Sequence, residues 1–103
     1  MGTRHKVTDL ASLPPGKATC VQAAGRAIAL FNLGGRLHAV DDACTHAGGN
    51  LSEGEVDGTV VTCPWHGATF DLATGAALSA PARENVRCYP VHVQGQDVLL
   101  ELD

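Results

Sequence analysis

Residues 44–66 read CTHAGGNLSEGEVDGTVVTCPWH, and this stretch decides how the rest of the chain must fold. It begins with Cys-Thr-His at residues 44–46 and, after a gap of 16 residues, ends with Cys-Pro-Trp-His at residues 63–66. Cysteine sulfur and histidine nitrogen bind both zinc and the iron of iron–sulfur clusters. Two short loops that each offer one cysteine and one histidine can therefore hold a single metal centre between them.

The candidate ligands are Cys44, His46, Cys63 and His66. Two cysteines and two histidines complete the tetrahedral shell of a structural zinc site, so a zinc-stabilised binding module is one interpretation. Zinc fingers, however, usually carry the cysteine pair and the histidine pair on separate elements. The mixed motifs favour a binuclear cluster in which one iron takes both thiolates and the other takes both imidazoles.

The segments around these motifs have the pattern of short strands separated by turn residues. No segment keeps the 3.6-residue apolar period of a helix, apart from one helical turn expected at residues 9–13, before Pro14. We expect a mostly β fold of antiparallel strands, as a small barrel or as stacked sheets. The predicted strands cover residues 4–8, 17–23, 26–33, 36–41, 59–62, 68–72, 86–93 and 97–102.

Glycine-containing pairs fix where these strands turn. Ala24-Gly25 and Gly34-Gly35 predict two tight hairpin turns, and so an antiparallel meander over residues 17–41. Thr74-Gly75 should turn the strand of residues 68–72 back, which puts the second motif at the tip of a hairpin.

Length and composition bound the remaining possibilities. A chain of 103 residues suits a single domain over residues 1–103, and with 45% hydrophobic but only 4% aromatic residues its core must be mainly aliphatic. The net charge of −4 disfavours nucleic acid and anionic membranes, and suits a protein partner with a basic docking patch. Without an apolar run of about 20 residues or an apolar leader, we expect a soluble cytoplasmic protein.

The other cysteines and the nearby acidic residues receive plainer interpretations. Cys20 and Cys88 lie in apolar strand-like segments, which predicts buried and unreactive thiols. Five carboxylates close to the motifs are read mainly as solvated loop charges: Asp41, Asp42, Glu53, Glu55 and Asp57.

The two motifs resemble the C-x-H and C-x-x-H signature of Rieske [2Fe–2S] proteins, in which two histidines replace two cysteines on one iron. Residues 51–54 (LSEG), residues 70–75 (FDLATG) and the later Pro81 are similar to the soluble ferredoxins of that family. The resemblance therefore covers most of the chain. It implies a small Rieske-like domain with a cluster-binding subdomain of two hairpin loops at about residues 42–82.

Carried over to this sequence, the resemblance implies one [2Fe–2S] cluster with Cys44 and Cys63 on the inner iron and His46 and His66 on the outer iron. The implied function is one-electron transfer from an NAD(P)H-dependent flavoprotein reductase to a terminal oxygenase, by a monomer. The chain itself would not be an enzyme, since no iron position stays open. The alternatives are a nitrite reductase small subunit and the zinc-stabilised module.

The same resemblance predicts a low reduction potential. High-potential members join their two loops by a disulfide and carry a serine and a tyrosine as hydroxyl donors after the second motif. Trp65, Ala68 and Phe70 stand at the corresponding positions of this sequence, so the link and both donors are missing. Trp65 is expected to shield the cluster, and Pro81 to belong to a third covering loop.

Overall fold

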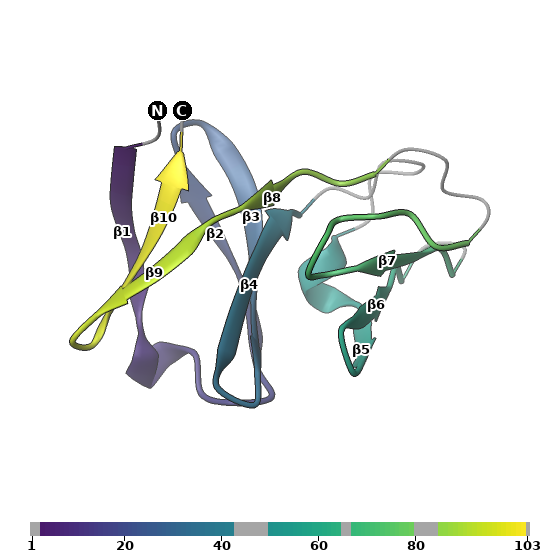
Figure 1. Cartoon of the computed structure of the whole chain (residues 1–103), viewed down its shortest axis with the longest axis horizontal. Helices are drawn as coiled ribbons and strands as arrows, with labels where there is room; N and C mark the ends of the chain where they lie inside the picture. Colours follow the sequence, from purple (N-terminus) through teal and green to yellow (C-terminus); the bar gives the residue numbers. More distant parts are fainter. Residues whose placement is uncertain (1–2, 43–49, 65–66, 80–84, 103) are drawn as a thin grey trace.

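The computed structural model describes residues 3–42, 50–64, 67–79 and 85–102, whose strands form three antiparallel sheets (Figure 1). The first sheet has the order β1-β10-β9, with β1 at Thr3–Asp9, β10 at Asp97–Leu102 and β9 at Val91–Gln94. The second has the order β2-β3-β4-β8, at Ala18–Ala23, Arg26–Leu33, Arg36–Asp41 and Cys88–Tyr89. The third has the order β5-β6-β7, at Glu55–Asp57, Val60–Thr62 and Thr69–Asp71.

The second sheet lies between two hydrophobic cores. Ile28 and Leu30 of β3 face a core that we call the base core, shared with the first sheet, whereas Ala29 and Phe31 face a core that we call the ligand-side core, shared with the third sheet. Burying a side chain such as Leu30 contributes about 1.5–3 kcal/mol, so β3 stabilises both halves. The base core contains Leu13, Ile28, Leu30, Ala39, Tyr89, Val98, Leu100 and Leu102. The ligand-side core contains Ala29, Phe31, Val40, Leu51, Val61, Cys63, Ala68, Phe70, Leu72 and Val86.

The predicted meander is confirmed by the pairing of β2 with β3 and of β3 with β4. Its first turn has a positive φ at both central residues, 51° at Ala24 and 76° at Gly25. This is the conformation of a two-residue hairpin loop whose twist matches the flanking strands. The expected helical turn is confirmed as a 3-10 helix at Leu10–Ser12, with the Asp9 carboxylate accepting the Ser12 N–H at 2.9 Å.

The prediction of a single strand at residues 86–93 is wrong. Pro90 separates β8 from β9, and the two halves belong to different sheets: β8 pairs with β4, whereas β9 pairs with β10. Proline has no N–H for a ladder, so the strand breaks there, although the Pro90 carbonyl still accepts the Glu101 N–H at 3.0 Å. Figure 1 shows that β8 and β9 run from the side of the molecule near the third sheet across to the first sheet.

Two elements between the motifs were not predicted. A 3-10 helix, η2, covers Leu51–Glu53, and β5 follows it at Glu55–Asp57. Both are only three residues long, too short to give a periodic pattern. Among the described residues no helix is long and apolar enough to cross a membrane.

Candidate metal-binding site

Cys63 directly follows β6, where its N–H donates to the carbonyl of Ala68 at 2.7 Å. This bond continues the β6–β7 ladder, in which Val61 pairs with Phe70 and Thr62 with Thr69. Gly67, with φ of +74°, supplies the left-handed turn that brings the chain back. The predicted hairpin is thus confirmed up to Pro64 and from Gly67, while Trp65 and His66 lie outside the described residues.

The side chain of Cys63 is 1% exposed and lies in the ligand-side core with Ala68 and Phe70, which are both fully buried. A thiolate is costly in such apolar surroundings unless a positive charge compensates it. Bound iron provides that charge, so the position of Cys63 fits a cluster ligand. The described part of the chain contains no group of three or more His, Cys, Asp or Glu side chains that could hold a metal ion, and Cys44 and His46 also lie outside it.

Asp42, which precedes residues 43–49, holds the start of η2, which follows them, by hydrogen bonds. Its carbonyl accepts the Leu51 N–H at 2.7 Å, and its carboxylate accepts the Ser52 N–H at 2.9 Å. Asp42 is 3% exposed, so its interpretation as a solvated loop charge is wrong. The reason is that η2, which packs against β2 and β3, lies beside Asp42 and donates hydrogen bonds to it. Glu53, in contrast, is exposed as expected.

The residues on either side of residues 80–84 are tied to β7 and to the turn after it. The Thr69 and Ser79 hydroxyls are 2.7 Å apart, and the Asn85 side chain accepts the Ala77 N–H at 2.9 Å. Gly75 lies so close to this segment that a Cβ there would be 2.2 Å from the Val86 carbonyl oxygen. Pro81, assigned to a third loop, lies outside the described residues.

These flanking residues meet in one place. Leu51 follows the first motif, and Val86 follows the segment that contains Pro81. Cys63 and Ala68 lie on either side of residues 64–67, within and after the second motif. All four residues belong to the ligand-side core. The described structure thus brings the attachment points of three ligand-side segments to one end of the molecule (Figure 1).

Asp41 faces away from Asp42, as neighbouring strand residues do. Its carboxylate accepts a hydrogen bond from the Tyr89 hydroxyl, and the Arg87 guanidinium lies 5.4 Å from the centre of the Tyr89 ring. Burial and the Asp41 carboxylate raise the pKa of Tyr89 above its ordinary value. Asp41 therefore stabilises the junction of β4 and β8.

The prediction of burial is wrong for Cys20, which is exposed. Cys20 lies on the edge strand β2, on the face opposite Val21, which packs against the base core. Partial burial of the sulfur and a hydrogen bond to Asp42 raise the pKa of this thiol. Cys88 is partly buried, and burial raises its thiol pKa as well. Both shifts lower the thiolate fraction, which supports the interpretation of unreactive thiols.

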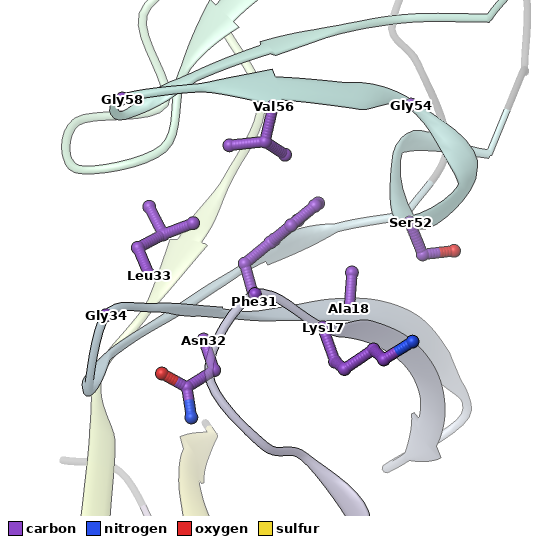
Figure 2. Close-up of a pocket in the computed structure, with 11 residues that line it drawn as sticks. Lys17, Ala18, Phe31, Asn32, Leu33, Gly34, Ser52, Gly54, Val56 and Gly58 are labelled. Atoms are coloured by element: carbon purple, nitrogen blue, oxygen red, sulfur yellow. The ribbon is translucent and has the colours of Figure 1, made fainter.

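A cavity of about 640 Å³ lies between the second sheet and the η2–β5 segment. Figure 2 shows the side chains of Phe31, Leu33 and Val56 pointing into it. Cys63 is not among its lining residues, and neither is any other cysteine, histidine or carboxylate that the structure describes. The cavity is therefore separate from Cys63. Its remaining lining residues are Gly16, Lys17, Ala18, Asn32, Gly34, Ser52, Gly54 and Gly58.

Comparison with known proteins identifies the family. The model of the Rieske [2Fe-2S] domain matches residues 3–90. The ferredoxin component of the naphthalene 1,2-dioxygenase system of Pseudomonas aeruginosa is 38% identical over 93 residues, which cover 90% of this chain and 89% of that protein. The 3-phenylpropionate/cinnamic acid dioxygenase ferredoxin subunit of Escherichia coli K12 is 43% identical over 94 residues, covering 90% and 88%.

Solved structures agree with this similarity. The ferredoxin of carbazole 1,9a-dioxygenase from Nocardioides aromaticivorans IC177 superposes with a TM-score of 0.92 at 30% identity, covering 98% of this chain and 99% of that one. A chain from the complex of reduced oxygenase and oxidized ferredoxin in carbazole 1,9a-dioxygenase gives a TM-score of 0.88 at 32% identity, covering 95% and 92%.

Proposed function

This chain belongs to the Rieske [2Fe–2S] domain family and is a ferredoxin-type electron carrier with one such cluster, and we propose that Cys44, His46, Cys63 and His66 hold it. The observation that carries the proposal is that the family match over residues 3–90 includes all four residues. Cys44 and Cys63 would bind one iron as thiolates, and the two histidines the other. When bound, the cluster accepts and releases one electron.

The contribution of the protein is to fix the ligands and to keep water from the inner ones. Cys63 leaves a hydrogen-bonded strand and lies in an apolar core, so its sulfur is held in a dry and rigid environment. Rigid ligands suit electron transfer, because little rearrangement accompanies the change of charge. No substrate-binding side chains are needed for this role.

The partners follow from the relatives. The compared complex joins a ferredoxin to an oxygenase, which supports the proposal that this chain donates electrons to a terminal oxygenase. A flavoprotein reductase that oxidises NAD(P)H would supply those electrons. We propose that the chain acts in the cytoplasm as a monomer. The net charge of −4 suits partners with basic docking surfaces.

The domain organisation is proposed as a single domain over residues 1–103, with a cluster-binding subdomain at about residues 42–82. Two facts support it. Both cores share β3 and β4, so neither half has a complete core alone. The ligand-side core collects the residues that flank the proposed ligands, Leu51 and Cys63 among them.

A low reduction potential is also proposed. Ala68 and Phe70 are fully buried in the core that contains Cys63, and neither side chain can donate a hydrogen bond. Hydroxyl donors to cluster sulfur or to a cysteine ligand stabilise the more negative, reduced state and so raise the potential. Without them, the reduced state is less favoured.

The alternatives differ in what the purified protein would contain. The named relatives are ferredoxin components of dioxygenase systems, which favours the carrier over a nitrite reductase subunit and over a zinc-stabilised module. The test is metal and acid-labile sulfide analysis combined with a reductive titration. We expect iron and sulfide in equal amounts and uptake of one electron per cluster. Colourless protein with zinc and without sulfide would contradict the proposal.

A further inference from the structure

Asp42 occupies an unusual position for an aspartate beside a ligand loop. It is 3% exposed, at the end of β4, and its own N–H donates to the Ala27 carbonyl of β3 at 3.1 Å. Burying a carboxylate is unfavourable unless it receives hydrogen bonds. The position therefore requires an explanation beyond solubility.

The hydrogen bonds of Asp42 go to the helix on the far side of the ligand loop. The N–H groups of Leu51 and Ser52 open η2, where a helix has no internal acceptors for them. Asp42 accepts both, with its carbonyl at 2.7 Å and its carboxylate at 2.9 Å. Asn50, the residue in the local capping position, makes no side-chain cap bond. The cap of η2 is thus supplied from across the loop.

We propose that Asp42 is the positioning residue of the first ligand loop. It ties the two ends of the segment 43–49 to each other and to β3, and so fixes where the loop that carries Cys44 and His46 begins and ends. This inference rests on the proposed function for the role of Cys44 and His46.

Four variants test the proposal. Asp42→Ala removes the acceptor for the Ser52 N–H, whereas Asp42→Asn keeps an oxygen there. Asp41→Ala and Asp41→Asn are matched controls, because Asp41 is the neighbouring carboxylate but bonds to Tyr89 in the base core. Each control removes one negative charge at the same end of β4 without touching the cap of η2.

The first measurement is amide hydrogen exchange on the purified full-length protein. In Asp42→Ala the Ser52 amide should exchange about tenfold faster or more relative to β3 amides, which corresponds to ~1.4 kcal/mol. Asp42→Asn should restore most of the protection, and the Asp41 variants should leave it unchanged. An unchanged Ser52 amide in Asp42→Ala overturns the proposal, as does equal acceleration in Asp42→Asn.

The second measurement uses the cluster-loaded proteins. Asp42→Ala should release iron to a chelator about tenfold faster than Asp41→Ala and should show a shifted reduction potential in the molecules that stay loaded. Equal release rates with unshifted potentials overturn the proposal. If the wild-type protein itself takes up no iron and sulfide, it is the proposed function that fails, and the amide measurement still decides whether Asp42 fixes the loop.

Discussion

The two ends of the molecule are built in different ways. Around the base core, β1, β3 and β10 are seven, eight and six residues long, and backbone ladders hold them together. On the ligand side, β5, β6 and β7 have three residues each. There the ends of the chain segments are held by side-chain hydrogen bonds, such as those between Asp42 and Ser52 and between Thr69 and Ser79.

This difference separates stability from function. We expect the long strands of the base to fold without help from a metal, because their apolar faces pack together in the base core. The short strands of the third sheet share the ligand-side core with Ala29 and Phe31 of β3 and Val40 of β4. Substitutions in the loops or hydrogen bonds of the ligand side should therefore leave the sheets of the base folded.

The largest expected effect comes from replacing Cys63, the one proposed ligand that the structure describes. Cys63→Ser should abolish binding of the cluster, since the buried thiolate is lost, yet leave the base sheets folded. Cys20→Ser is the matched control, because Cys20 is an exposed cysteine outside both motifs and serine keeps a donor for Asp42. Iron and sulfide content with circular dichroism checks both. Loss of the cluster in Cys20→Ser, or its retention in Cys63→Ser, would break the separation of the two ends.

Substitution of two fully buried leucines, one in each core, allows the stabilities of the two cores to be compared directly. Leu30 lies in the base core and Leu51 in the ligand-side core, both 0% exposed. Truncation of a buried leucine to alanine costs about 2–5 kcal/mol. Leu30→Ala should lower the unfolding free energy of the whole protein, measured with urea, because β3 supports both sides.

Leu51→Ala should act more locally. Hydrogen exchange should increase in η2 and β5 more than in β1 and β10, and the cluster should be lost more readily. Equal acceleration in all strands for both variants would show that the two ends unfold as one unit, and would contradict the comparison.

A smaller effect concerns docking. Leu78 is 51% exposed and donates its N–H to Thr69 on the ligand side, whereas Val93 is 48% exposed on β9 of the base. Exposed apolar side chains near a redox centre suit transient contact with a partner protein. Leu78→Ala should raise the KM for the oxygenase several-fold with an unchanged potential, and Val93→Ala should not. A larger increase in KM for Val93→Ala than for Leu78→Ala would place the docking surface for the oxygenase on the base.

The smallest effect lies in the base at alkaline pH. The pKa of Tyr89 is raised by burial and by Asp41, so the folded state favours the neutral phenol. That contribution is complete below the ordinary tyrosine pKa near 10 and is lost as the pH rises through the folded value. Tyr89→Phe should thus lose less stability than the wild type above pH 10. Parallel stability curves would contradict the assignment, since the cysteines are common to both proteins.

Much of the base could be predicted from the sequence. Short strand-like segments and the Ala24-Gly25 and Gly34-Gly35 pairs between them define β2, β3 and β4, since these signals are local. The break at Pro90 was missed although proline itself was a signal, because the apolar run continues on both sides of it.

The ligand side was less predictable. The motif containing Cys63 and its hairpin follow from spacing, but the buried state of Asp42 depends on η2, which lies beside it and donates the Ser52 N–H to its carboxylate. The exposure of Cys20 depends on β2 being an edge strand. Both are consequences of contacts between distant segments, which a local pattern does not contain.

The central claim is that a cluster is held by two cysteines and two histidines. Pulsed electron paramagnetic resonance of the reduced protein, labelled with ¹⁵N only in histidine, tests it most directly. We predict strong couplings from two histidine nitrogens, one of which disappears in His66→Cys if a cluster still assembles. A reduced cluster without any histidine coupling would contradict it.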